Sequence, residues 1–221
     1  MSEKPASLDR QLVLALQRHR VDRVLDVGAN AGQYAMRLRR SGWCGRILSF
    51  EPLADLHAEL VRAASADCRW EVAPRMALGA RAERAVLQRS AESDMSSLAA
   101  QTPLLERLSP SSAVVAEEVV DVRPLADVVV VAPAERLFLK LDVQGTEMAV
   151  LDGLGGLWAH LVGLQLELAL TLLYAGETRY LDVCRRLESL GFALALVVPG
   201  YFDGKLARQL QFDGVFLRED G

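Results

Sequence analysis

The chain has 221 residues, 51% of them hydrophobic and 24% charged, and a formal net charge of −4. This composition is typical of a folded globular protein and excludes a disordered chain, a fibrous repeat and a small disulfide-rich scaffold. The length suits one α/β domain, so we expect a single domain over residues 1–221. Because nucleic-acid binders normally show a basic excess, the acidic balance argues against a nucleic-acid partner.

The apolar stretches and the cysteines predict a cytoplasmic protein without membrane contact. The longest apolar stretch, residues 161–175, is interrupted by Gln165 and Glu167 and is too short to span a bilayer. The first ten residues contain no apolar core of a signal peptide. The three cysteines are scattered without metal-binding spacing, which favours free thiols in a reducing compartment. The sequence leaves the oligomeric state open.

Strand-like and helix-like segments alternate along the chain, which predicts a mostly parallel twisted sheet with helices on both faces. An N-terminal helix capped by Ser7 is expected within residues 1–20. The expected strands are 21–27, 46–50, part of 69–78, 85–88, 117–122, 137–141, 161–168, 192–198 and 211–217. The further helices are expected at 33–40, after Pro52, at 145–151 and at 178–190. No helix separates the last two strands, so they are expected to pair antiparallel.

Other segments carry weaker or more detailed signals. Residues 90–112 are rich in Ser, Pro and Ala, and we expect a long active-site loop or lid with a short helix near 103–108. Residues 125–130 fit either a short helix or a strand. In the helix at 178–190, the side chains expected to face the core are Leu181, Cys184 and Leu187.

A glycine turn follows the first strand in VLDVGANAG at residues 24–32. Open α/β sheets bind ligands beside such turns, at the carboxyl ends of their strands. Gly28 and Gly32 would let the backbone approach a ligand where a Cβ would clash. Glu51 ends the next strand, and a carboxylate there can accept hydrogen bonds from ribose hydroxyls. We therefore favour a nucleotide site over a plain turn that needs glycine only for its backbone angles.

The turn does not match a dinucleotide fingerprint. The pattern G-x-G-x-x-G/A falls on Gly28, Asn30 and Gln33, so two of its three positions differ, and no GxxxxGK[ST] phosphate loop occurs. Asp26, just before the turn, would repel phosphate and favour a cation. A ligand with an adenosine, an ammonium and a sulfonium suits these residues better than NAD. The expected cofactor is therefore S-adenosylmethionine.

A second group of polar residues lies in KLDVQGTE at residues 140–147. This strand ends at the same sheet edge as Gly28, so Asp142 is expected to face the crevice. Lys140 inside a strand needs a partner, and a structural ion pair with Glu147 is one alternative. Glu167, late in the next strand, is expected beside Asp142. Two neighbouring carboxylates raise one pKa or bind a hard divalent ion such as Mg²⁺.

These segments together resemble the FkbM-type family of S-adenosylmethionine-dependent O-methyltransferases. The most specific match is LKLDVQGTEMAVLDG, and it is accompanied, in the family's order, by VLDVGANAGQYA, SFEP, APRMALG, SDMSSL, LQLELALTLLYAGE, PGYFD and LQFDGVFLR. The resemblance covers most of the chain. It implies the class I, Rossmann-like methyltransferase fold, with an antiparallel last strand. Many members carry Glu where this chain has Gln144, although Gln also occurs.

The resemblance also implies roles for individual residues. The cofactor would be bound by Asp26, Gly28, Asn30, Gly32, Tyr34, Glu51, Pro52, Met76, Ala77 and Asp142. The substrate side would be formed by Lys140, Glu147, Glu167 and Tyr174, together with Ser96 and Ser97 of the serine-containing loop.

Methyl transfer to a hydroxyl is an in-line displacement that needs alignment and a base. The candidates for the base are Asp142 and Glu167, with Lys140 and Glu147 as further catalytic candidates. The same two carboxylates could instead hold a divalent metal that activates the hydroxyl, and the sequence leaves this choice open. The expected substrate is a small hydroxylated molecule, a sugar or a natural-product scaffold. A nicotinamide-dependent oxidoreductase and a non-catalytic nucleotide-binding module are the alternatives.

Overall fold

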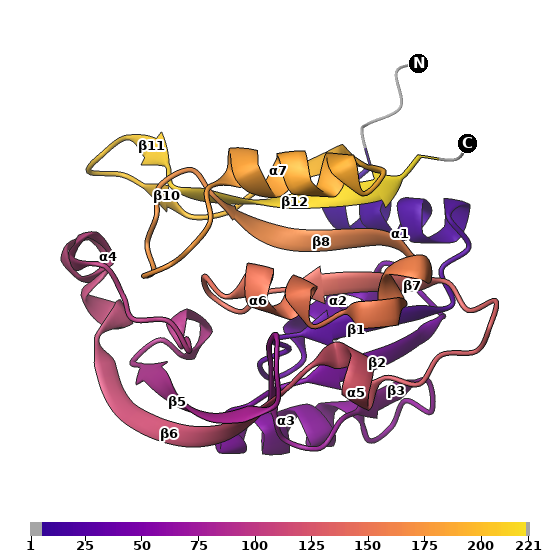
Figure 1. The fold of residues 1–221 in the computed structure, drawn as a ribbon, viewed down its shortest axis with the longest axis horizontal. Coiled ribbons are helices and arrows are strands. Elements are labelled where there is room, and N and C mark those ends of the chain that lie inside the picture. The colour runs from indigo at the N-terminus through magenta and orange to yellow at the C-terminus, as the bar shows by residue number, and fades with distance from the viewer. Residues whose placement is uncertain (1–5, 220–221) are drawn as a thin grey trace.

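The structure is a computed structural model that describes residues 6–219, with a seven-stranded sheet at its centre (Figure 1). The strand order is β3-β2-β1-β7-β8-β12-β9. These strands are β1 (Arg23–Val27), β2 (Arg46–Phe50), β3 (Trp70–Val72), β7 (Leu137–Leu141), β8 (Leu161–Ala169), β9 (Phe192–Pro199) and β12 (Gln211–Arg218). Neighbours from β3 to β8 run parallel, whereas β12 is antiparallel to both β8 and β9. The predicted sheet with its antiparallel last strand is confirmed.

Helices cover both faces of this sheet. One buried cluster is filled by α1 (Leu8–Arg18), α2 (Gln33–Arg40) and α3 (Ala54–Ala64), and the other by α5 (Leu125–Val128), α6 (Glu147–Asp152) and α7 (Tyr180–Ser189). Central strands are therefore apolar on both faces, as β7 with its sequence LFLKL illustrates. Lys140 is the one charged residue of that strand, and it is buried.

The helix boundaries follow local signals, with one exception in side-chain orientation. Ser7 accepts a hydrogen bond from Arg10 N at 3.3 Å and caps α1 as predicted, while residues 1–5 of the expected segment lie outside the described residues. The prediction that Leu181 faces the core is wrong, because 48% of it is exposed. At about 100° per residue, Leu181 lies roughly 140° from the middle of the face that the buried Val183 and Leu187 define, so it is on the solvent side of α7.

A second, three-stranded sheet lies to one side and packs on α3 (Figure 1). β5 (Glu83–Ser90) and β6 (Val114–Arg123) pair antiparallel, and β4 (Ala77–Leu78) joins β6 parallel. Both long strands extend beyond their predicted ranges, since each satisfies the backbone hydrogen bonds of the other. This sheet brings the segment after β5 to the carboxyl edge of the central sheet.

Residues 90–112 form short elements that pack on the domain. They contain 3₁₀ turns at Ser93–Met95 and Pro110–Ser112 and the predicted helix α4 (Pro103–Leu108). Thr102 N donates to Leu173 O at 2.9 Å, which ties this segment to the chain after β8. A further short pair, β10 (Phe202–Asp203) and β11 (Arg208–Gln209), precedes β12. No helix within residues 6–219 combines the length and apolar character that crossing a membrane requires.

Candidate active site

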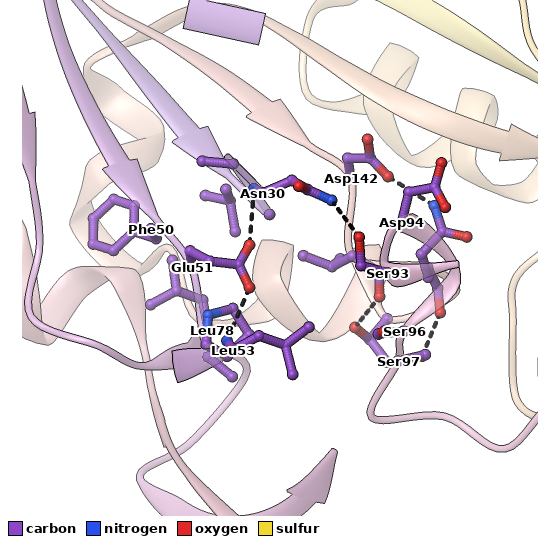
Figure 2. Close-up of a pocket in the computed structure, with 18 of the residues that line it drawn as sticks. Asn30, Phe50, Glu51, Leu53, Leu78, Ser93, Asp94, Ser96, Ser97 and Asp142 are labelled. Carbon is purple, nitrogen blue, oxygen red and sulfur yellow. Dashed lines mark hydrogen bonds between the residues drawn. The ribbon is translucent and has the colours of Figure 1, made fainter. Parts of the chain in front are cut away.

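A cavity of about 300 Å³ lies at the carboxyl ends of β1, β2 and β7 (Figure 2). This edge is where open α/β sheets bind ligands, and the volume lies at the lower end of the range for small-molecule sites. Its wall contains most of the predicted residues, namely Gly28, Asn30, Tyr34, Glu51, Pro52, Met76, Ala77, Ser96, Ser97, Lys140 and Asp142. Asp26, Gly32, Glu147, Glu167 and Tyr174 are not part of that wall.

The glycine turn forms the floor of the cavity. The backbone N–H groups of Gly28 and Ala29 both donate to Phe50 O, at 3.1 and 3.0 Å, which joins the ends of β1 and β2. Gly28 has φ +71°, and a Cβ there would lie 1.8 Å from Asp142 O. Only glycine therefore allows the ends of β1 and β7 to approach this closely.

Gly32 lies outside the cavity wall, and its missing side chain makes room for packing. Its φ is +93°, and a Cβ there would lie 2.6 Å from the indole ring of Trp70. Asn30 also adopts a positive φ, 51°, which asparagine tolerates better than most residues. Its side-chain oxygen accepts a hydrogen bond from Ala31 N at 2.7 Å and so supports the turn from within.

Glu51 is held at the end of β2 by backbone donors. Its carboxylate accepts hydrogen bonds from Asn30 N at 2.8 Å and from Leu53 N at 2.9 Å, one on each oxygen (Figure 2). The residue is only 4% exposed, and burial raises the pKa of its carboxyl to about 7. A carboxylate offers about four lone-pair positions, so two remain for donors in the cavity. Apolar side chains of Phe50, Met76 and Leu78 line the same region.

Lys140 connects Asp142, which lines the cavity, to Asp26, which is buried below the glycine turn. Its Nζ lies 3.3 Å from Asp26 Oδ1 and 3.6 Å from Asp142 Oδ2, and donates to Gly28 O at 2.9 Å. Burial alone would lower the pKa of Lys140, but the two carboxylates outweigh it and raise the pKa. The alternative ion pair with Glu147 does not form. Asp26 is fully buried below the turn and receives a further hydrogen bond from Ser49 Oγ at 3.2 Å.

Asp142 projects from the end of β7 into the cavity, with its side chain 47% exposed. Gln144 Nε2 donates to Asp142 Oδ1 at 2.7 Å, and Tyr174 Oη donates to Gln144 Oε1 at 2.8 Å. Glu147 accepts from Val143 N and Gly145 N, both at 3.3 Å, and supports the loop from behind. Tyr174 and Glu147 thus orient the residues that line the cavity.

The serine-containing segment covers the opposite side of the cavity. Ser97 Oγ donates to Gln144 O at 2.6 Å, and Asn30 Nδ2 donates to Ser93 Oγ at 3.4 Å (Figure 2). Ser96 Oγ accepts from Ser90 N at 3.1 Å, which fixes the turn after β5. The hydroxyl of Ser97 therefore anchors this segment to the rim, while that of Ser96 stabilises the segment internally.

Glu167 lies behind Asp142 and outside the cavity wall. Leu141 and Leu166 are register partners in β7 and β8, so the residues that follow them, Asp142 just after β7 and Glu167 within β8, are neighbours along the backbone. Glu167 accepts a hydrogen bond from Gln211 Nε2 at 2.8 Å, and burial followed by the charge of Asp142 raises its pKa. Within residues 6–219, no three His, Cys, Asp or Glu side chains are arranged to hold a metal ion.

Several polar wall residues were not predicted as site residues from the sequence. They are Gln33, Arg37, Ser93, Asp94, Gln144, Thr146 and Asp213. Asp94 belongs to the segment SDMSSL, and Asp213 is the one acidic residue in the otherwise largely apolar strand QFDGVFLR. An acid within a buried strand was the available signal for Asp213. Its significance depends on the antiparallel direction of β12, which places the beginning of that strand at the ligand-binding edge.

Comparisons with known proteins agree with this architecture. The model of the FkbM methyltransferase domain matches residues 26–194. The chain is similar to a structure described as an S-adenosylmethionine-dependent methyltransferase from Listeria monocytogenes, with 9% identity, 96% of this chain and 98% of that chain covered, and a TM-score of 0.53. It is also similar to a structure described as an O-methyltransferase from Klebsiella pneumoniae, with 11% identity, 99% and 84% covered, and a TM-score of 0.50.

A third similar structure belongs to a longer protein. The mitomycin 7-O-methyltransferase MmcR has 11% identity and a TM-score of 0.48, with 96% of this chain covered, but this chain spans about half of that protein, 53%. No curated protein sequence matches the chain. At 9% and 11% identity, the structures from Listeria monocytogenes and Klebsiella pneumoniae indicate a shared fold.

The sheet order, the antiparallel last strand and the cavity beside the glycine turn define a class I, S-adenosylmethionine-dependent methyltransferase. Within that class, the chain belongs to the FkbM methyltransferase family. The family resemblance seen in the sequence is confirmed.

Proposed function

We propose that this protein transfers a methyl group from S-adenosylmethionine to a hydroxyl group of a small molecule, such as a sugar or a natural product. One observation carries the proposal. A single cavity joins Glu51 and an apolar wall at one end to the carboxylates of Asp94 and Asp142 at the other (Figure 2). This arrangement suits an adenosine at the first end and a proton acceptor at the second.

The residues present fit the cofactor. The two lone-pair positions that Glu51 leaves open suit the two ribose hydroxyls, and Met76 and Ala77 with Pro52 would flank the adenine. The backbone at Gly28 and Asn30 would pass close to the methionine part, and Asp142 would lie near the transferred methyl group. When bound, the cofactor supplies a methyl carbon on a sulfonium, which is already a good leaving group.

Asp142 is the proposed base for the hydroxyl proton. None of the described residues that line the cavity is a histidine, so carboxylates are the available acceptors. Gln144 and Lys140 both contact Asp142, by a 2.7 Å hydrogen bond and a 3.6 Å ion pair, and thereby hold it in place. A base in such a position contributes roughly 10²–10⁴-fold to the rate. We assign Lys140, Glu147 and Tyr174 to the support of Asp142 and its loop.

We do not assign Glu167 as the base. Its carboxylate is outside the cavity and is engaged by Gln211. A Mg²⁺ ion shared by Asp142 and Glu167 would require Glu167 to turn toward the cavity. The proposal therefore favours a carboxylate base over a metal-activated hydroxyl.

Ligand-dependent thermal unfolding tests the proposed function. The purified protein is melted with S-adenosylmethionine, S-adenosylhomocysteine or NAD, each with and without Mg²⁺. A ligand at about 100 times its Kd adds about 2.7 kcal/mol, roughly 5–10 °C for a chain of this size. We expect that shift with the two sulfur ligands alone. A shift with NAD alone would favour an oxidoreductase, and a Mg²⁺-dependent increment would favour the metal.

A mass measurement then tests catalysis. Protein that binds the cofactor is incubated with S-adenosylmethionine and hydroxylated small molecules, and we expect a product in which a methyl group replaces one hydroxyl hydrogen. Binding without methylation of any hydroxylated compound would favour the non-catalytic module.

A further inference from the structure

Asp213 reaches the cavity from a strand that the preceding mechanism does not use. It lies at the start of β12, opposite Glu167 in β8, and its half-buried carboxylate is part of the cavity wall. Because β12 runs antiparallel to β8, its first residues, and not its last, arrive at the ligand-binding edge. This places Asp213 two strands away from Asp142 along the same edge.

The carboxylate is held by the buried side chain of Gln165, which is in turn held by Tyr34. Gln165 Nε2 donates to Asp213 Oδ2 at 2.8 Å, and Tyr34 Oη donates to Gln165 Oε1 at 3.1 Å. Gln165 and Tyr34 are only 4% and 5% exposed, so neither can easily turn away. A buried amide with both ends engaged holds the acid in one orientation. A carboxylate on the surface needs no such support. Here the two hydrogen bonds hold the Asp213 carboxylate in the orientation that faces the cavity.

The end of the cavity that contains Asp213 is acidic. Asp94, Asp142 and Asp213 line it, with Asp26 buried behind Lys140, against the two basic residues Arg37 and Lys140. Lys140 already pairs with Asp26 and Asp142, and Arg37 lies 3.8 Å from Asp9. The cofactor adds one net positive charge, from an ammonium and a sulfonium against one carboxylate, so an excess of negative charge remains.

The burial of Asp213 also favours a ligand that donates a hydrogen bond to its carboxylate. Burial raises the pKa of its carboxyl, while the hydrogen bond from Gln165 opposes that effect. Hydroxyl or ammonium groups of a ligand would supply the missing donors, whereas a ligand carboxylate or phosphate would add repulsion in a region of low dielectric.

We propose that Asp213, held by Gln165 and Tyr34, binds the methyl acceptor and restricts it to neutral or cationic hydroxylated molecules, with anionic ones excluded. This inference rests on the proposed function. Asp213 would accept hydrogen bonds from a hydroxyl or amine near the reacting one, while Asp142 receives the proton. Gln165 acts as a positioning residue, because it lies outside the cavity wall and reaches the acceptor only through Asp213, and Tyr34 supports Gln165.

The experiment uses three probes that share one carbon skeleton and differ in charge. They are propane-1,2-diol, its 3-amino derivative and glycerate, each titrated into full-length protein saturated with S-adenosylhomocysteine. The readout is the NMR signal of the Gln165 side-chain amide, which contacts Asp213 directly. We expect the cationic and neutral diols to shift this signal, and glycerate to bind at least fivefold more weakly than the cationic diol.

Two variants identify the source of this preference. Asp213→Asn keeps the shape and the acceptor oxygen for Gln165, and we expect it to reduce the difference between the probes to less than twofold. Asp182→Asn makes the same change on the exposed face of α7, and we expect this variant to keep the full difference between the probes. S-adenosylhomocysteine affinity should stay within twofold in both variants. That measurement also shows that Asp213→Asn is folded.

The outcomes separate this inference from the proposed function. Wild-type protein that fails to bind S-adenosylhomocysteine overturns the proposed function, and with it the basis of the inference. If the protein does bind S-adenosylhomocysteine, three results would overturn the inference alone. The first is glycerate that binds as tightly as the cationic diol or more tightly, and the second is an unchanged Gln165 signal with every probe. The third is a preference for the cationic diol that remains in Asp213→Asn.

Discussion

At the β2 end of the cavity, the polar contacts run between a side chain and nearby backbone, as in Glu51 with Leu53 N and Asn30 N, 2 and 21 residues away. At the β7 and β12 end, side chains from distant segments hold one another, as in Tyr34 with Gln165, 131 residues apart. The first end is a local motif that a strand, a turn and a helix carry together. The second end exists only when several distant segments are packed together.

The largest effect that would separate the two ends is expected from Asp142→Ala. Removal of the proposed base should lower methyl transfer by roughly 10²–10⁴-fold. Binding of S-adenosylhomocysteine should fall far less, because Glu51 and the glycine turn are untouched. Rates and calorimetric affinities of the same preparation check this. Asp152→Asn, an exposed acid on α6, is the control that should change neither quantity. Full activity in Asp142→Ala would refute the assignment of the base.

A pH titration of stability compares one buried carboxyl from each end. Burial raises the pKa of both Glu51 and Glu147 to about 7, above the ordinary value of 4.5. Between those values the folded state binds more protons than the unfolded state, so stability falls as the pH rises through this window. At about 1.4 kcal/mol per pKa unit, each group costs up to about 3 kcal/mol at pH 8.

Denaturant unfolding of ligand-free protein at pH 5 and pH 8 measures this cost. Glu147→Gln keeps an acceptor for the loop amides and should remove its share of the decrease. Glu188→Gln, on the exposed side of α7, should leave the decrease unchanged. A wild-type stability that rises between pH 5 and pH 7 would contradict the raised pKa values.

Glu51→Gln tests the cofactor end directly. A hydrogen bond to a charged group is worth about 1.5–3 kcal/mol, so affinity for S-adenosylhomocysteine should fall roughly 10–150-fold. In the wild type, this affinity should also weaken as the pH falls below about 7, because protonated Glu51 is a poorer acceptor. Calorimetry at several pH values checks both points. If Glu51→Gln keeps the wild-type pH dependence of S-adenosylhomocysteine affinity, Glu51 is not the group that titrates at this end of the cavity.

The smallest predicted effect concerns the close approach of β1 and β7. Gly28 and Gly176 both have a positive φ, +71° and +78°, but only at Gly28 would a Cβ meet backbone, at 1.8 Å from Asp142 O. Gly176→Ala should cost about 1–2 kcal/mol of unfolding free energy from backbone strain alone. Gly28→Ala should cost a further 1–3 kcal/mol or so, because neighbouring backbone must shift. Equal losses in denaturant unfolding would show that the two strand ends do not need this contact.

The local segments of this protein were predictable because their patterns are short. The spans of β2, β7, α2 and α4 agree with the expected ranges residue for residue, since each pattern begins and ends on a clear signal. The error at Leu181 has a different origin. The spacing of Leu181, Cys184 and Leu187 fits one stripe of a helix, but α7 buries the stripe of Val183 and Leu187, and its contacts with β8 and β9 decide which stripe is covered.

By itself, the sequence determined the order of strands and helices, the glycine turn, Glu51 at the end of β2 and the family. These features depend on residues close together in the chain. Only the tertiary structure decided that Lys140 pairs with Asp26 and Asp142, that Gly32 lies under Trp70, and that Glu167 remains behind the wall while Asp213 reaches it. The physical reason is that strand neighbours and strand direction, set by packing of the whole sheet, select which side chains share one cavity.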